Sequence, residues 1–312
     1  MSHSHKFRNF LVAAGIACTS MAVYNRFTSK KADEIPLSGD DLCSRQFNWK
    51  LGTIFYTRQG SGSPVLLIHD YVSPAASWEW SALTRELKDH TVYTLDLPGC
   101  GRSDKNFTAY TDYLYVQLIS DFITKVIQEP TALVTSVRSV QLAVLMEKND
   151  SSMLTHVIAL NPFFGRSANT RGWIFGKLIE LPVIGTFFYN RLLSSDRLEE
   201  YVEKKKLFSR PEPAHDYVAA CFKASHLDGL HSKYLLSSYL LGYLNPSSAH
   251  SLRKLSVPFS VLIGTDVADY KKTTLFYREQ NSQIEIRQIE NGRVMMQMEH
   301  AADVAHQISS LL

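Results

Sequence analysis

Short apolar runs alternate with longer amphipathic stretches through most of the chain from residue 47 onwards. Most of the runs are continuously apolar, as in strands buried on both faces, and the segments between them carry a helical pattern. Strands are expected at 51–57, 65–69, 91–95, 131–134 and 156–160, and helices at 78–87, 113–126 and 140–147. This alternation predicts right-handed βαβ crossovers and a mostly parallel central sheet with helices on both faces, an α/β fold.

The alternation of apolar runs and helical segments stops after residue 161. Residues 163–252 are aromatic-rich, helical in character and punctuated by prolines. This pattern predicts a helical lid inserted over the ends of the strands, with its aromatic stripes buried inside the lid. The sheet pattern then resumes at 257–264, followed by an edge strand at 284–289 and a closing helix over 300–312.

The longest weakly polar run lies at the N-terminus, at residues 10–24, with basic residues on both sides. A bilayer core requires roughly 20 apolar residues, so the run is short for a membrane span. We interpret residues 1–28 as an uncleaved, single-pass anchor that leaves the folded domain outside the cytoplasm. The alternatives are a cleaved signal peptide, with Ser20, Met21 and Ala22 as its small-x-small site, and a soluble helix. Residues 29–46 are polar and are expected to form a linker.

The amino-acid composition limits the kinds of partner and cofactor that we expect. A chain of 312 residues with 45% hydrophobic content can build one sizeable core and a lid without disulfides or metals. The four cysteines are widely spaced, so we expect neither a metal site nor a bound cofactor. The net charge is +3, and beyond the N-terminus no basic cluster is interleaved with aromatic residues, which argues against nucleic acid as a partner.

Five segments together resemble the α/β-hydrolase superfamily over about residues 47–312. They are LLIHDYVSPAASWEW, VYTLDLPGCGRSD, LVTSVRSVQLAVLM, VPFSVLIGTD and IENGRVMMQMEHAADVAHQI. The most specific is DLPGCGRSD at 96–104, which stands in the right order relative to the other four. The resemblance implies an α/β-hydrolase fold and a Ser, acid and His triad on three separate loops.

The residues at the triad positions do not fit that chemistry. The G-x-S-x-G elbow aligns with residues 135–139, which places Val137 at the nucleophile. The acid usually lies three residues after the glycine that ends its strand, here Val267, and the histidine five residues before Glu299, here Val294. Because a triad works only as a unit, three valines predict that ordinary serine hydrolysis has been lost.

The oxyanion turn also departs from the family pattern. Its equivalents here are His69, Asp70, Tyr71 and Arg138. Asp70 replaces the usual glycine, and a carboxylate would oppose a developing oxyanion unless it points away. We interpret His69 as structural, bonding nearby backbone.

Four residues are weak candidates for a displaced catalytic set: Ser136, Ser139, Asp266 and His300. Each also has an ordinary explanation. Ser139 is the small residue that the elbow needs, Ser136 a turn residue, Asp266 a solvated loop residue and His300 a surface residue at a helix start.

Two functions therefore remain. The first is a membrane-tethered pseudoenzyme or binding module whose lidded apolar pocket binds a lipid-like small molecule or a partner protein. The second is an active hydrolase of ester, amide or epoxide-like substrates with a shifted catalytic set.

Overall fold

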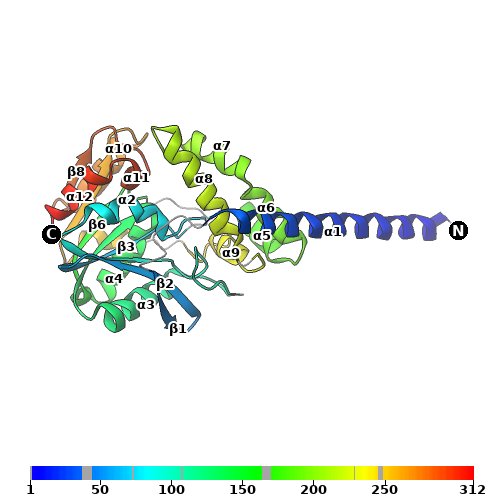
Figure 1. Ribbon diagram of the computed structural model, residues 1–312, viewed down its shortest axis with the longest axis horizontal. Coiled ribbons are helices and arrows are strands. Elements are labelled where there is room, and N and C mark those ends of the chain that lie inside the picture. The colour runs from blue at the N-terminus through cyan, green and yellow to red at the C-terminus, as the bar shows by residue number, and fades with distance from the viewer. Residues whose placement is uncertain are drawn as a thin grey trace.

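A computed structural model describes residues 2–36, 44–71, 74–106, 108–163, 170–227, 229–244 and 249–312. Eight strands form one sheet in the order β1-β2-β4-β3-β5-β6-β7-β8 (Figure 1). The strands are β1 Ser44–Trp49, β2 Gly52–Gln59, β3 Ser63–Ile68, β4 His90–Leu95, β5 Thr131–Ser136, β6 Leu154–Leu160, β7 Phe259–Gly264 and β8 Glu285–Ile289.

The first two strands form a hairpin that joins the sheet antiparallel, since β1 pairs with β2 and β2 pairs with β4 in opposite directions. All remaining pairs are parallel, from β4 with β3 to β7 with β8. The carboxyl ends of the parallel strands consequently meet at one edge of the sheet, where such folds place their ligand sites.

Successive strand residues point to opposite faces, so each strand contributes side chains to two hydrophobic cores, one on each face of the sheet. Leu66 and Ile68 of β3 pack with helices α3 Asp112–Phe122, α4 Val140–Asn149 and α10 Tyr270–Gln280. Val65 and Leu67 pack on the other face with α2 Ser81–Glu86 and α12 Ala301–Ser309. The short helix η2, Ser77–Trp80, leads into α2, and α11, Met296–Glu299, leads into α12.

Five α-helices lie between β6 and β7 and gather at one side of the sheet (Figure 1). They are α5 Thr170–Glu180, α6 Ile184–Leu192, α7 Ser195–Lys205, α8 Pro211–His226 and α9 Lys233–Leu240. Proline at the start of α8 suits a first turn, whose N–H groups have no partner within the helix. We refer to these five helices as the lid.

Helix α1, Ser2–Glu34, extends away from the body as a long rod (Figure 1). Only its last turns touch the rest of the chain. Tyr24 packs edge-on against Phe187 of α6, with ring centroids 5.2 Å apart, and Asn25 donates to the Val183 carbonyl at 3.0 Å. Further along, Ala32 is fully buried beside α7 and α8. The helix is therefore attached to the lid rather than to the sheet.

The predicted α/β-hydrolase fold is confirmed, including the mostly parallel sheet, the helices on both faces and the long apolar N-terminal helix. The boundaries differ near the N-terminus. Helix α1 continues to Glu34 and β1 begins at Ser44, so the segment between them is shorter than the expected linker at 29–46. The polar residues 29–34 remain helical because they lie on the lid.

Candidate functional site

The strand-to-helix turn after β5 has the geometry of a nucleophile elbow. Strand β5 ends at Ser136, residues Val137–Ser139 form one turn of 3-10 helix, and α4 begins at Val140. Val137 adopts φ 49°, the left-handed region that a β-branched side chain strongly disfavours. Valine therefore occupies the strained apex at which a hydrolase of this fold holds its nucleophile.

Ser139 and Ser136 flank the apex, and both are buried and hydrogen-bonded. The Ser139 hydroxyl lies 2.9 Å from the Ile68 carbonyl and 2.7 Å from the Ser136 carbonyl, and it accepts the Ser136 N–H. Ser136 is the last residue of β5 rather than the turn residue expected from the sequence. Its hydroxyl donates to Oε1 of Glu79 at 2.6 Å. These bonds hold the turn together and leave both hydroxyls turned into the protein.

Glu79 is the residue that the sequence analysis missed. It lies in η2 and is buried beneath the lid, where Gln297 of α11 completes a polar cluster with Ser136. Burial raises the pKa of Glu79 to about 8, and the bonds from Ser136 and Gln297 only partly offset that rise. The carboxyl group is therefore mostly protonated at neutral pH. The signal in the sequence was one acidic residue between two tryptophans, in SWEW.

Asp70 and Arg138 form an ion pair across the predicted oxyanion turn. Arg138 Nη1 lies 2.8 Å from Asp70 Oδ2, and both side chains are largely shielded from solvent. Burial lowers the pKa of Arg138, but Asp70 more than compensates and the pKa lies above its usual value. The guanidinium also stacks on Phe163 and Tyr239, 5.3 and 5.8 Å from their ring centres. The carboxylate at the turn is thus neutralised by the residue that follows the elbow apex.

Two buried donor atoms, one within this pair and one beside it, lack a hydrogen-bond partner within the described part of the chain. They are the Tyr71 hydroxyl and Arg138 Nε, and both atoms are buried. Burial holds the pKa of Tyr71 well above its usual value, so its hydroxyl stays protonated and able to donate. Unsatisfied buried donors are rare and call for a specific explanation.

His69 and Asp96 support the loops around the turn. His69 Nδ1 lies 2.8 Å from the Asp70 carbonyl oxygen, and Nε2 accepts the Leu97 N–H at 3.0 Å. Burial lowers the pKa of His69 more than Asp96 raises it, so the ring is neutral. Asp96 accepts the backbone N–H groups of Ser77 and Arg102 at 2.8 and 3.0 Å. Both side chains therefore hold backbone, and Asp96 also pairs with the Arg102 guanidinium at 3.1 Å.

The predicted acid position lies after β7. Val267 is half-buried, and the N–H of the preceding, exposed Asp266 donates to the Gly292 carbonyl. Asn161 joins this loop to the predicted histidine loop. Its Oδ1 accepts the Gly264 N–H at 2.9 Å, and its Nδ2 donates to the Val294 carbonyl at 3.1 Å. The two loops therefore lie side by side, as in a triad enzyme, but they are joined by an amide.

The predicted histidine position is covered by the lid. Val294 packs against an apolar cluster that includes Met295 and residues of α7 and α8. The Glu299 carboxylate accepts the N–H groups of Ser209 and Arg210, which lead into α8, at 2.9 to 3.0 Å. The Glu299 side chain is 1% exposed. Together these contacts hold the lid against the core.

His300 follows Glu299 and begins α12. Its ring lies near Asp303 on the same helix, with Nδ1 3.7 Å from Oδ2. Within the described residues, no hydrogen bond joins His300 to Asp266, Ser136 or Ser139. Ser136 and Ser139 therefore contact each other, but no described hydrogen bond brings either of them together with Asp266 or His300.

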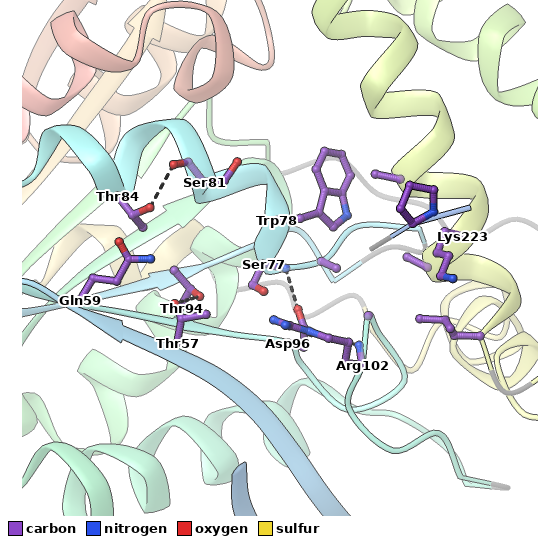
Figure 2. A pocket seen from close by; sticks show the side chains of 16 residues that line it. Thr57, Gln59, Ser77, Trp78, Ser81, Thr84, Thr94, Asp96, Arg102 and Lys223 are labelled. Carbon is purple, nitrogen blue, oxygen red and sulfur yellow. Dashed lines mark hydrogen bonds and ion pairs between the residues drawn. The ribbon is translucent and has the colours of Figure 1, made fainter. Parts of the chain in front are cut away.

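The structure forms a groove elsewhere, between α8 and the core (Figure 2). Trp78 and Ser77 of η2 line it, together with Asp96, Arg102 and Lys223. The three triad positions are not among its lining residues. In the part of the chain that the structure describes, no group of three His, Cys, Asp or Glu side chains could hold a metal ion.

The sheet order, the elbow and the inserted helices define the chain as a protein of the α/β-hydrolase fold. Residues 65–307 match the sequence profile of the alpha/beta hydrolase family, and the chain belongs to that family. No curated protein is significantly similar in sequence.

Solved structures of the same fold are similar over most of the chain. An alpha/beta hydrolase fold protein from Burkholderia ambifaria has a TM-score of 0.68 at 12% identity, covering 86% of this chain and 97% of its own. A serine hydrolase involved in carbazole degradation has a TM-score of 0.66 at 17% identity, with coverages of 86% and 97%. A bromoperoxidase from Bacillus anthracis has a TM-score of 0.65 at 16% identity, with coverages of 86% and 98%. At these identities the likeness concerns the fold alone.

Proposed function

We propose that this protein is a membrane-tethered member of the α/β-hydrolase family that binds an apolar ligand beneath its lid and does not perform serine hydrolysis. The observation that carries the proposal is Val137 at φ 49°. The backbone at the elbow has the shape that a nucleophile requires, which supports the alignment of Val137 with the apex. The apex has no hydroxyl to activate.

The other two triad positions support the same reading. Val267 is half-buried in the loop after β7, and Val294 packs under the lid, so neither position holds an acid or a base. A nucleophile without a base to deprotonate it, and a base without an acid to orient it, contribute little alone. Restoring catalysis would therefore require all three side chains.

The groups around the ion pair support a binding role. Tyr71 and Arg138 each hold one buried donor without a partner among the described residues, and the Arg138 guanidinium lies over the rings of Phe163 and Tyr239. Because Asp70 already neutralises Arg138, these donors suit an uncharged oxygen acceptor rather than an anion. A long-chain lipid with ester or hydroxyl oxygens has this combination of groups.

Photocrosslinking tests the binding proposal. The full-length protein in nanodiscs is irradiated with a monoacylglycerol carrying a photoactivatable acyl chain, and the labelled peptides are mapped. We expect labelling of peptides around Arg138 and in lid helix α7, reduced in a Tyr71→Phe, Arg138→Met double variant. Labelling confined to α1, equal in wild type and variant, would show annular lipid only and contradict the proposal.

Labelling with a fluorophosphonate probe tests the loss of hydrolysis. We expect no labelling of wild type or of Val137→Ser alone, since a serine without a base stays a weak nucleophile. The triple variant Val137→Ser, Val267→Asp, Val294→His is expected to label. Turnover of p-nitrophenyl esters by wild type, at a rate well above buffer, would overturn the proposal.

One observation favours the alternative of a hydrolase with a shifted catalytic set. The Ser136 hydroxyl lies 2.6 Å from Glu79, whose pKa of about 8 is in the range that general acids and bases use. Against it, Ser136 and Glu79 are 1% and 2% exposed, so a substrate has little access to either. Wild-type labelling that maps to Ser136 and disappears in Ser136→Ala, with Ser139→Ala as the matched control, would establish this alternative.

Helix α1 is the proposed membrane anchor. Its segment His5–Glu34 is long and apolar enough to cross a membrane, and none of its most apolar window is buried in the protein. A signal sequence can have the same length and apolar composition, so the intact mass of the membrane-extracted protein decides between an anchor and a cleaved signal. We expect the uncleaved chain in the carbonate-resistant pellet; a mass corresponding to cleavage after Ala22 would contradict the anchor.

A further inference from the structure

The outer side of the lid carries a strip of exposed apolar side chains. Trp173 and Ile174 of α5 are 54% and 63% exposed, and Leu181 and Val183, in the turn to α6, are 45% and 38% exposed. Trp173 and Ile174 are neighbours on α5, and Leu181 and Val183 follow directly after the end of that helix. We call these four residues the lid strip.

A polar residue interrupts the strip without breaking it. Lys177 lies four residues after Trp173, on the same face of α5, and its ammonium group pairs with Glu180 at 3.0 Å. Long basic side chains of this kind cover apolar surface with their methylenes while the charge stays in water. A strip of aromatic and aliphatic residues with one lysine is typical of helices that lie in a membrane interface.

The lid strip is attached to the point where α1 leaves the lid. Asn25 donates to the carbonyl of Val183, itself a member of the strip, and Asn25 Oδ1 accepts from Asn190 of α6. Tyr24 packs on Phe187 one turn into α6. The Val183 end of the strip therefore lies at the level of residues 24 and 25 along the rod.

The free part of the rod contains the apolar run that can enter a bilayer. Residues 2–23 precede the first lid contact, and the apolar part, residues 10–23, extends about 21 Å at 1.5 Å per residue; the long side chains of Lys6 and Arg8 before it can reach the membrane surface. The hydrocarbon core of a bilayer is about 30 Å thick. With this part of α1 across a bilayer, Asn25 lies at the boundary of the bilayer, and so does the turn that holds Val183.

We propose that the lid strip is a second membrane contact, seated in the headgroup and acyl boundary of the bilayer that α1 crosses. This inference rests on the proposed tether and deepens it. The exposed apolar residues Val23 and Phe27 of α1 flank Asn25, which bonds Val183 of the strip, so a bilayer that covers this part of α1 also reaches the strip. The lid and the proposed binding site beneath it then lie next to the bilayer, from which a lipid ligand would come.

Tryptophan fluorescence tests the proposal on the full-length protein in vesicles. Trp173 is the exposed member of the four tryptophans, while Trp49 and Trp80 are 8% and 0% exposed and Trp78 is half-buried against Tyr217 of α8. Helix α1 contains no tryptophan, so the signal does not report on the tether. Phosphatidylcholine brominated near the carbonyl end of its acyl chains is the shallow quencher, and the same lipid brominated near the chain end is the deep quencher.

We expect the shallow quencher to remove most of the Trp173 emission, the deep quencher to remove less, and the Trp173→Phe variant to lose the quenched component. Trp173 emission unaffected by either lipid but quenched by aqueous iodide would overturn the proposal. The proposal would also be overturned if neither the brominated lipids nor iodide quenched Trp173 and this protection increased with the density of protein in the vesicle. A second copy of the chain would then cover the strip. Carbonate extraction of the same vesicles separates failure of the lid contact from failure of the tether.

Discussion

Replacing Glu79 by glutamine should make the folded protein far less sensitive to pH. Glutamine is neutral at every pH, has nearly the shape of a protonated glutamate, and can still accept the Ser136 hydroxyl that lies 2.6 Å from Glu79 Oε1. In wild type the folded protein must either hold a proton on this buried carboxyl or bury a charge. The variant removes that requirement.

The size of the effect follows from the pKa of Glu79, which rises from 4.5 in the unfolded chain to about 8 in the folded protein. The folded state binds the proton more tightly, so wild type has its full stability below pH 4.5 and loses it as pH rises to 8. Each pH unit costs about 1.4 kcal/mol, which makes roughly 3 kcal/mol by pH 7 and roughly 5 kcal/mol by pH 8. Above pH 8 this contribution is constant.

Thermal unfolding of the full-length protein in detergent, from pH 5 to pH 9, measures the difference. We expect Tm of Glu79→Gln minus Tm of wild type to grow by about 10 °C between pH 5 and pH 8, since 1 kcal/mol corresponds to about 2 to 4 °C for domains of this size. Glu86→Gln, at an exposed position on the neighbouring α2, is the matched control for loss of a surface charge. Parallel curves for wild type and Glu79→Gln would refute the reasoning.

Three further substitutions test the site. Val137→Gly removes a β-branched residue from a positive φ and should raise Tm by a few degrees, equivalent to about 1 kcal/mol; Val267→Gly, at a position without positive φ, should lower it. In a double-mutant cycle of Asp70→Asn and Arg138→Gln, the losses of unfolding free energy in the two single variants should add up to more than the loss in the double variant. We expect a difference, the coupling energy, of about 1 to 3 kcal/mol from unfolding curves; additive losses would mean that the pair is not coupled. Glu299→Ala should speed hydrogen exchange at the two lid amides it binds about tenfold or more, because hydrogen bonds to a charged group contribute about 1.5 to 3 kcal/mol; unchanged exchange there, with sheet amides as the internal reference, would show that the lid is held by its apolar contacts instead.

The sheet was predictable because the signal was local. Runs such as 65–69 carry the pattern of a strand buried on both faces, and the elbow at 135–139 could be aligned by its position between such a strand and a helix. The structure places the predicted apex, Val137, at a positive φ, which the residue type argued against. Sequence order and spacing thus located the turn even where side-chain preference opposed it.

The polar groups around the elbow were not predictable in the same way. The Asp70 and Arg138 pair joins residues 68 positions apart, and Ser136 meets Glu79 across 57. No periodicity encodes such contacts, since they depend on which strands are neighbours in the sheet. Asp70 was recognised as foreign to an oxyanion turn, but its neutralising partner could be identified only after β3 and β5 were known to pair.

Helix α1 runs without a break from its free end to its contacts with α6 and α8. A membrane protein usually joins its span to its domain by a hinge, so that each can orient separately. Under the proposed anchoring this chain has no such joint, and a tilt of the span is also a rotation of the lid. Because a helix tilts to match the thickness of the bilayer around it, at a cost of fractions of a kcal/mol per Å of mismatch, thicker and thinner membranes would set the lid at different angles.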